Sequence, residues 1–447
     1  MNSRFKYSIL ILFLTIYSII PFEKNSAYEF KVGVAKADIT PPIGFPISGY
    51  HTERLATNIH DELYARAMVF DDGIKKLVLV IVDNDRPYFE AFNKAREKIN
   101  IELGIIPENV IISATHTHTG PMRIKPYDEI LSLKIVDAVK MALQNLQPAF
   151  IKAGRGRTEN ISFNRRYLMK DGTVKFNPGV LNPDIVKPVG PNDSEIGIFY
   201  ITTFDGKPIA TFVNFANHLD TIGGTEISAD YPYFMGKILK KVNGNDMMVF
   251  FGIGTTANVN HINVKKTEKF PKFGKSDQIG HVLAGEVIKA YPTLALQENI
   301  LLKSEREVIF LEIPQYTIEE IKRAEINAKK ISSDHTSTSE IREAQKILAV
   351  YKRQGKPIDA EIIVFGIGDI AIVSLTGDIF VQLGLALKEK SPFKYTFIVE
   401  NCYSNIGFVP DEKSFDEGAY EIEVCQIKKG EGEKIVDAAV RMLKKIK

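Results

Sequence analysis

Short apolar runs that alternate with segments of helical spacing are the feature that most constrains the fold. "KKLVLVIVD" at residues 75–83 and "NVIISAT" at residues 109–115 are typical of strands buried on both faces. Between them, residues 89–104 have helical spacing and end at Gly104, a common helix terminator. The same alternation predicts helices at 128–145, 233–242, 317–354 (a pair), 379–390 and 431–447, and strands at 209–217, 247–254, 305–314, 360–377 (a hairpin) and 395–401.

This pattern predicts an α/β fold with mixed β-sheets flanked by helices in one large domain. A chain of 447 residues with 45% hydrophobic residues has enough apolar side chains for a sizeable core. A polar stretch with Gly and Pro, from about 154 to 191, is predicted to form surface loops and short hairpins. The net charge of +2, without long runs of like charge, argues against a nucleic-acid-binding surface.

The N-terminus has the order of a secretory signal peptide. Arg4 and Lys6 precede the apolar run at 7–22, and small residues follow up to Ala27. We therefore expect residues 1–27 to be a signal peptide, residues 28–447 to be the folded domain, and the protein to be secreted or periplasmic. The alternative is an uncleaved N-terminal membrane anchor.

The chain has two cysteines, Cys402 and Cys425. Export would permit a disulfide, but the sequence does not give the distance between them. Two thiolates at this spacing lack the partners of a structural zinc site.

Polar residues follow several predicted strands at the point where each strand ends. His116 and His118 come directly after 109–115, His218 follows 209–217, and Asp378 follows the second strand of the hairpin. Because ligands bind beyond the carboxyl ends of strands in open α/β sheets, we expect these side chains to converge. His116, His218 and Asp378 are a suitable set for a hydrolytic zinc ion. His118 is either a further ligand or a group that transfers protons and contacts substrate.

Several ordered motifs resemble the neutral/alkaline (non-lysosomal) ceramidase family. The resemblance begins at "VGVAKADITPPIGFPISGY" (32–50) and runs to the C-terminus. From the resemblance we expect no counterpart of the C-terminal immunoglobulin-like domain of the longer members. The other motifs are "HDELYARAMVFDDG" (60–73), "NVIISATHTHTGP" (109–121), "NISFNRR" (160–166), "VNFANH" (213–218) and "SADYP" (228–232).

The resemblance implies a single zinc ion and hydrolysis of the amide of ceramide to sphingosine and a fatty acid. By motif, His116 and His218 correspond to zinc ligands, and His118 lies in the active site. Arg165 corresponds to an arginine near the substrate, and Tyr420 to an active-site tyrosine. His118 is the candidate for carrying a proton to the leaving amine, while Arg165 or Tyr420 would stabilise the oxyanion or hold the substrate.

Four positions depart from the family pattern. Asp378, in "TGD", replaces a glutamate ligand of a "PGE" turn, and Phe408 stands where the family has a tyrosine ligand. Asn260 occupies the position of the serine of "GDVSP", and Asn258 that of its aspartate. Phe cannot bind metal and Asn is not a nucleophile, but Asn260 could orient water or donate to an oxyanion.

The predicted function is a secreted zinc-dependent hydrolase of an N-acyl amide, acting on ceramide or a related N-acyl lipid, with possible transient contact with a membrane surface. The alternative is a non-catalytic lipid- or glycan-binding relative that kept the fold. Asp83 and Asp85, at the end of another strand, are interpreted as capping or loop residues rather than extra ligands.

Overall fold

The computed structural model describes residues 29–50, 52–330 and 338–447. The predicted signal peptide and the turn between the helices of the 317–354 pair lie outside the described residues. No helix in the described part of the chain is long and apolar enough to cross a membrane.

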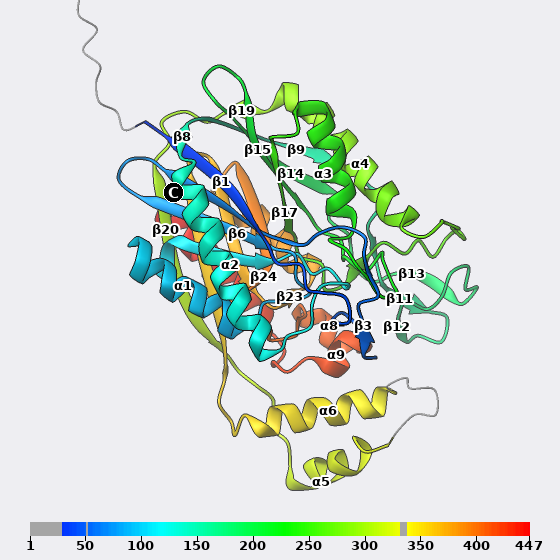
Figure 1. Cartoon of the computed structure of the whole chain (residues 1–447). Coiled ribbons are helices and arrows are strands. Elements are labelled where there is room, and N and C mark those ends of the chain that lie inside the picture. Colours follow the sequence, from blue (N-terminus) through cyan, green and yellow to red (C-terminus); the bar gives the residue numbers. More distant parts are fainter. Residues whose placement is uncertain (1–28, 51, 331–337) are drawn as a thin grey trace, which may run out of the picture.

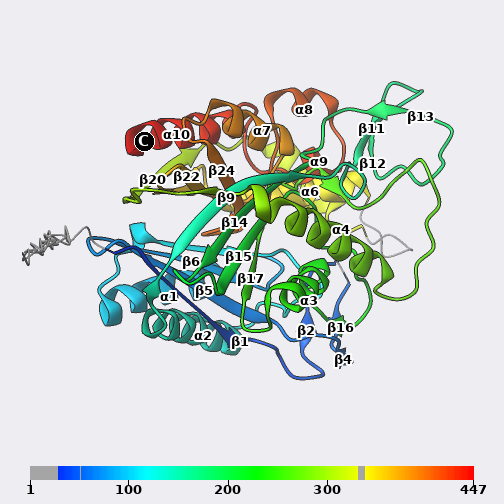
Figure 2. The ribbon, with the colours of Figure 1, turned by 90° about the horizontal axis from the view of Figure 1, so that it is seen from above.

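Two large sheets stack face to face at the centre of the molecule (Figure 2). In both, antiparallel pairs are mixed with parallel ones. The larger sheet has the order β20 (Leu302–Leu311), β21 (Ile358–Ile367), β22 (Ile370–Thr376), β24 (Tyr395–Cys402), β7 (Val110–Ala114), β6 (Lys76–Val82), β5 (Tyr64–Asp71), β1 (Lys31–Asp38) and β8 (Gln147–Pro148). The smaller has the order β17 (Met248–Ile253), β15 (Pro208–Phe215), β14 (Glu195–Thr202), β9 (Phe150–Arg157) and β19 (Ala295–Leu296).

The apolar runs are explained by burial on both faces. In β6, Leu79 and Ile81 pack between the sheets against residues such as Phe212 of β15. Their neighbours Val78 and Val80 point the other way, because side chains alternate along a strand, and pack under two helices. Those helices are α1 (Phe89–Leu103) and α2 (Lys125–Gln144).

Helices cover both outer faces, which gives four layers in the order helix, sheet, sheet, helix. The outer face of the larger sheet also carries α7 (Val381–Lys390) and α10 (Glu431–Ile446). The smaller sheet is covered by α3 (Tyr231–Asn243) and α4 (Gly274–Ala290). This confirms the predicted α/β fold with mixed sheets. The predicted helical pair, α5 (Ile318–Asn327) and α6 (Ser339–Lys352), lies to one side of these layers (Figure 1).

Parts of the polar stretch 154–191 are more regular than predicted. Its first residues belong to β9, and later residues form a small sheet of β11 (Arg166–Met169), β12 (Val174–Phe176) and β13 (Ile185–Pro188). The two cysteines are free and buried. Cys402 packs between the two sheets, and Cys425 packs under α10. The two thiols therefore lie in different hydrophobic cores.

Candidate metal centre and active site

Three histidines meet where strands of the two sheets end. His116 and His118 follow β7 of the larger sheet, and His218 follows β15 of the smaller one. The Nε2 atom of His116 lies 3.1 Å from Nε2 of His218 and 3.4 Å from Nε2 of His118. One nitrogen from each of the three rings lies within 4.8 Å of the other two.

The backbone around these residues turns sharply to make them meet. His116 has a φ of 71°, in the left-handed region that residues other than glycine seldom adopt, so the chain leaves the extended conformation there. The backbone N–H of His118 then donates to the carbonyl of Leu219, which joins the two histidine-bearing segments. Such strain persists only where the surrounding structure imposes it, often at functional sites.

Two of the imidazole rings are oriented through their Nδ1 atoms. Nδ1 of His116 faces the carbonyl oxygen of Asp85, and Nδ1 of His218 lies 3.3 Å from the carbonyl oxygen of Thr256. Since a carbonyl only accepts, each Nδ1 carries the proton and each Nε2 presents a lone pair. Burial lowers the pKa of His118 to about 4 and that of His218 well below its usual value, so both stay in the neutral form that binds metal.

This donor set fits a zinc ion. Nitrogens about 2.0–2.1 Å from a tetrahedral zinc lie roughly 3.3–3.4 Å apart, close to the 3.1 and 3.4 Å that separate Nε2 of His116 from the Nε2 atoms of His218 and His118. Two lone pairs facing each other at 3.1 Å in a buried site would repel without a cation or a proton between them. The three histidines therefore form a possible metal-binding cluster; the geometry does not identify the ion.

Asp85, interpreted from the sequence as a capping or loop residue, also lies beside the histidines. Its buried carboxylate accepts a hydrogen bond from Ser48 at 2.6 Å. The other oxygen, Oδ1, has no hydrogen-bond partner among the described residues and lies 3.8 Å from Nδ1 of His116 and 3.9 Å from Nε2 of His118. Asp83 is structural, since it accepts from Arg66 and from the backbone of Tyr64.

The loop at residues 48–50, inside the first family motif, closes over His118. Tyr50 meets the imidazole edge-on, with ring centres 5.5 Å apart. Gly49 has a φ of 100°, and a Cβ there would lie 2.5 Å from the Cα of His118. Arg54 holds the loop against His118 by donating to the carbonyl of His118 at 2.7 Å.

Asp378 lies in the same region but is not one of the three groups that converge. It begins β23 (Asp378–Ile379), directly after Gly377, whose φ is 95°. Its Oδ1 atom is buried without a hydrogen-bond partner among the described residues. Burial and the charge of Asp378 raise the pKa of Glu400 well above its usual value. Glu400 also accepts from Thr256, whose carbonyl faces His218.

Arg165, Tyr420 and Phe408 lie together. The guanidinium of Arg165 lies 5.6 Å from the ring centre of Phe408, and the ring of Tyr420 lies 5.7 Å from that of Phe408. Phe408 begins β25 (Phe408–Val409), which pairs with β23 so that Phe408 stands beside Asp378. Nε of Arg165 donates to the buried carboxylate of Glu421 at 2.9 Å.

The two asparagines at departing positions are held by hydrogen bonds. Asn260, in β18 (Val259–Asn260), donates to Asn177 at 3.2 Å and accepts from the backbone of Ile262. The side-chain oxygen of Asn258 accepts from the backbone N–H of Val381 at the start of α7. Asn258 therefore has a structural role at this helix terminus.

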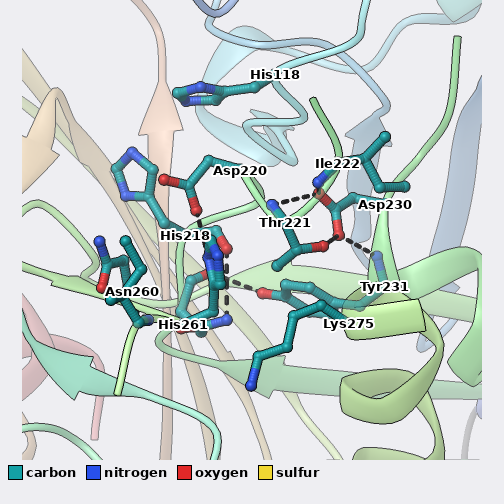
Figure 3. A network of polar contacts seen from close by, with 12 residues as sticks. His118, His218, Asp220, Thr221, Ile222, Asp230, Tyr231, Asn260, His261 and Lys275 are labelled. Atoms are coloured by element: carbon teal, nitrogen blue, oxygen red, sulfur yellow. Dashed lines mark hydrogen bonds and ion pairs between the residues drawn. The ribbon is translucent and has the colours of Figure 1, made fainter. Parts of the chain in front are cut away.

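A second acid–histidine pair lies beside the cluster and was not predicted. Asp220, two residues after His218, accepts from Nδ1 of His261 at 2.9 Å. Figure 3 shows the Asp220 carboxylate between His118, His218 and His261. The two residues are 41 positions apart, so no local motif indicates the pair.

Comparison with known proteins confirms the family resemblance. Residues 30–169 match the family model for the N-terminal part of neutral/alkaline non-lysosomal ceramidases. The neutral ceramidase of Pseudomonas aeruginosa is 26% identical over 246 residues, covering 48% of this chain and 35% of that protein. Neutral ceramidase A of Dictyostelium discoideum is 24% identical over 281 residues, covering 55% of this chain and 38% of that protein. The match thus spans little more than a third of each relative.

Two solved structures have a similar fold. The crystal structure of neutral ceramidase from Pseudomonas aeruginosa superposes with a TM-score of 0.74 at 18% identity, over 93% of this chain and 74% of that one. A ceramidase complexed with C2 gives a TM-score of 0.73 at 16% identity, over 93% and 75% of the two chains. At these identities the likeness establishes the fold.

Proposed function

We propose that this relative of the neutral/alkaline non-lysosomal ceramidases is a zinc-dependent hydrolase of an N-acyl amide bond. The substrate is ceramide, cleaved to sphingosine and a fatty acid, or a related N-acyl lipid. The observation that carries the proposal is the meeting of three imidazole nitrogens, two of them in rings fixed through Nδ1 by backbone carbonyls. Three histidine ligands and an open fourth position are a common arrangement in catalytic zinc sites.

His116, His118 and His218 would hold the ion. His118 joins this set because its Nε2 atom points into the cluster. Asp378, the carboxylate ligand predicted from the sequence, is an additional candidate because its Oδ1 atom is buried and unpaired among the described residues. When bound, zinc supplies a Lewis acid for the amide carbonyl and activates water for attack.

Residues outside the cluster would bind and orient the substrate. Arg165 is buried, and its Nε atom is held by Glu421, so the guanidinium is fixed for contact with a carbonyl or developing oxyanion. Burial raises the pKa of Tyr420, which keeps its phenol protonated and able to donate. The side-chain amide of Asn260 is fixed by Asn177, so we assign it an orienting role rather than a nucleophilic one.

Metal content of the purified protein tests the proposal first. We expect about one zinc per chain by elemental mass spectrometry and loss of this zinc in His218→Ala. The control is His281→Ala, which removes an exposed histidine of α4. Ceramides and other N-acyl amides are then assayed for fatty-acid release with and without a chelator. No bound metal after zinc loading would refute the proposal, and binding without product would favour the non-catalytic alternative.

We also propose that residues 1–27 are a signal peptide, that the protein is secreted or periplasmic, and that residues 28–447 are the catalytic domain. The basis is the order of basic, apolar and small residues at the N-terminus. N-terminal sequencing of the exported protein should begin at Tyr28. A retained N-terminus in a membrane fraction would instead indicate an anchor.

A further inference from the structure

Hydrolysis of an amide needs a proton donor, and His118 is poorly placed to be one. The leaving nitrogen of an alkylamide departs readily only when it is protonated, so a general acid must reach it. His118 was the candidate from sequence, but its Nε2 atom lies 3.4 Å from Nε2 of His116 and faces the metal cluster. A nitrogen that binds metal through its lone pair has no proton there to give.

The Asp220–His261 pair has the geometry of an oriented acid. Nδ1 of His261 lies 2.9 Å from Oδ1 of Asp220, and a carboxylate only accepts, so Nδ1 carries a proton. Nε2 of His261 makes no hydrogen bond to the described residues. It is also not one of the side-chain atoms that are both buried and without a partner, so it is open to solvent. The imidazole is 18% exposed, so this nitrogen is held in one orientation yet is accessible.

The charges around His261 favour its protonated form. Burial alone would lower the pKa of His261, but the carboxylates of Asp220 and Asp230 outweigh burial and the charge of Lys275, and they raise it above its usual value. These groups come from the segment after β15, the start of α3 and the first turn of α4 (Figure 3). Burial, in contrast, lowers the pKa of His118 and of His218.

We propose that His261 is the general acid of this active site and that Asp220 is its positioning residue. The inference rests on the proposed hydrolase function. The oxygen of water bonds to the acyl carbon while the carbon–nitrogen bond breaks. The leaving nitrogen takes the proton from Nε2 of His261, and the proton lost by the attacking water restores it. One water is consumed, and one fatty acid and one amine are formed.

The test compares two substrates that share an acyl chain, an N-alkylamide and a 4-nitrophenyl ester. The phenolate of the ester leaves without protonation, whereas the alkylamine does not. In His261→Gln, the side chain stays polar and of similar length but cannot transfer a proton. We expect kcat for the amide to fall about 10²- to 10⁴-fold, with KM and ester hydrolysis little changed. The control is His281→Gln, which alters the exposed His281–Asp277 pair of α4 and should change neither rate.

Zinc content and thermal unfolding separate a chemical role from a structural one. We expect His261→Gln to retain zinc and its melting temperature. Equal losses on both substrates, or no loss on the amide, would overturn the inference. If His261→Gln does not fold, Asp220→Asn tests the same pair and should impair the amide more than the ester. A wild-type protein that hydrolyses neither substrate would instead refute the proposed function.

Discussion

Replacing Glu421 with Gln tests whether a buried ion-pair network holds Arg165, the arginine proposed to bind substrate, in place. Glu421 directly follows Tyr420 in α9 (Tyr420–Val424). It accepts from Arg165 at 2.9 Å and from Arg166 at 3.4 Å. All three side chains are at most 4% exposed. Gln has the same shape but lacks the charge, so the substitution leaves the guanidinium of Arg165 without its carboxylate.

The expected cost follows from this burial. Breaking a buried ion pair by removing one partner costs about 3–5 kcal/mol, because a desolvated charge remains unpaired. Arg166 keeps a second carboxylate, Glu417, at 3.1 Å. We therefore expect a loss of about 3 kcal/mol in the free energy of unfolding, at the lower end of that range.

Denaturant unfolding measures this loss. The midpoint in urea should fall while the slope of the transition stays the same. Glu159→Gln is the matched control, because Glu159 and its partner Arg157 are 64% and 71% exposed and should contribute little. If both variants unfold at the wild-type midpoint, the Arg165–Glu421 pair does not stabilise the fold, and the argument for a fixed Arg165 fails.

Three further substitutions probe the proposed metal centre. Gly49→Ala should lower the melting temperature and zinc content together, since a Cβ at a φ of 100° would press on His118; wild-type values for both would contradict this. Asp85→Asn should weaken zinc binding about 10- to 100-fold in competition with a chelator while the fold is kept, because its negative charge lies within 4 Å of ring nitrogens of His116 and His118; unchanged affinity would assign Asp85 a purely structural role. Phe408→Tyr should tighten zinc binding in the same assay if residue 408 faces the ion beside Asp378, and an unchanged affinity would show that it does not.

The fold was predictable where one physical signal dominated. Strands such as β6 are buried on both faces, so their apolar runs are visible without any partner. Among the elements that were not predicted, α4 and β9 contain glycines that lower their propensity. Gly280 of α4 lies where a Cβ would meet the backbone of α3, and Gly154 of β9 where one would meet Leu294. In both, close packing decides the structure against local preference.

The site was predictable only in part. His116, His118 and His218 were found because each follows the end of a predicted strand. The proximity of Asp85 to the histidines was not predicted, and its partner Ser48 is 37 residues away in the sequence. The Asp220–His261 pair depends on a contact between two loops. The hydrophobic periodicity of the sequence gives no information on such a contact.

The three histidines follow strands of two different sheets, and this has a consequence for how the protein folds. His116 and His118 follow a strand of the larger sheet, and His218 follows a strand of the smaller one. An ion bound by all three histidines would link the two sheets. The complete metal site would form only after the sheets have packed against each other. Metal affinity would then add directly to the cohesion of the two halves, by RT ln(1 + [L]/Kd). A higher metal concentration during folding would thereby increase the fraction of the protein that reaches the native state.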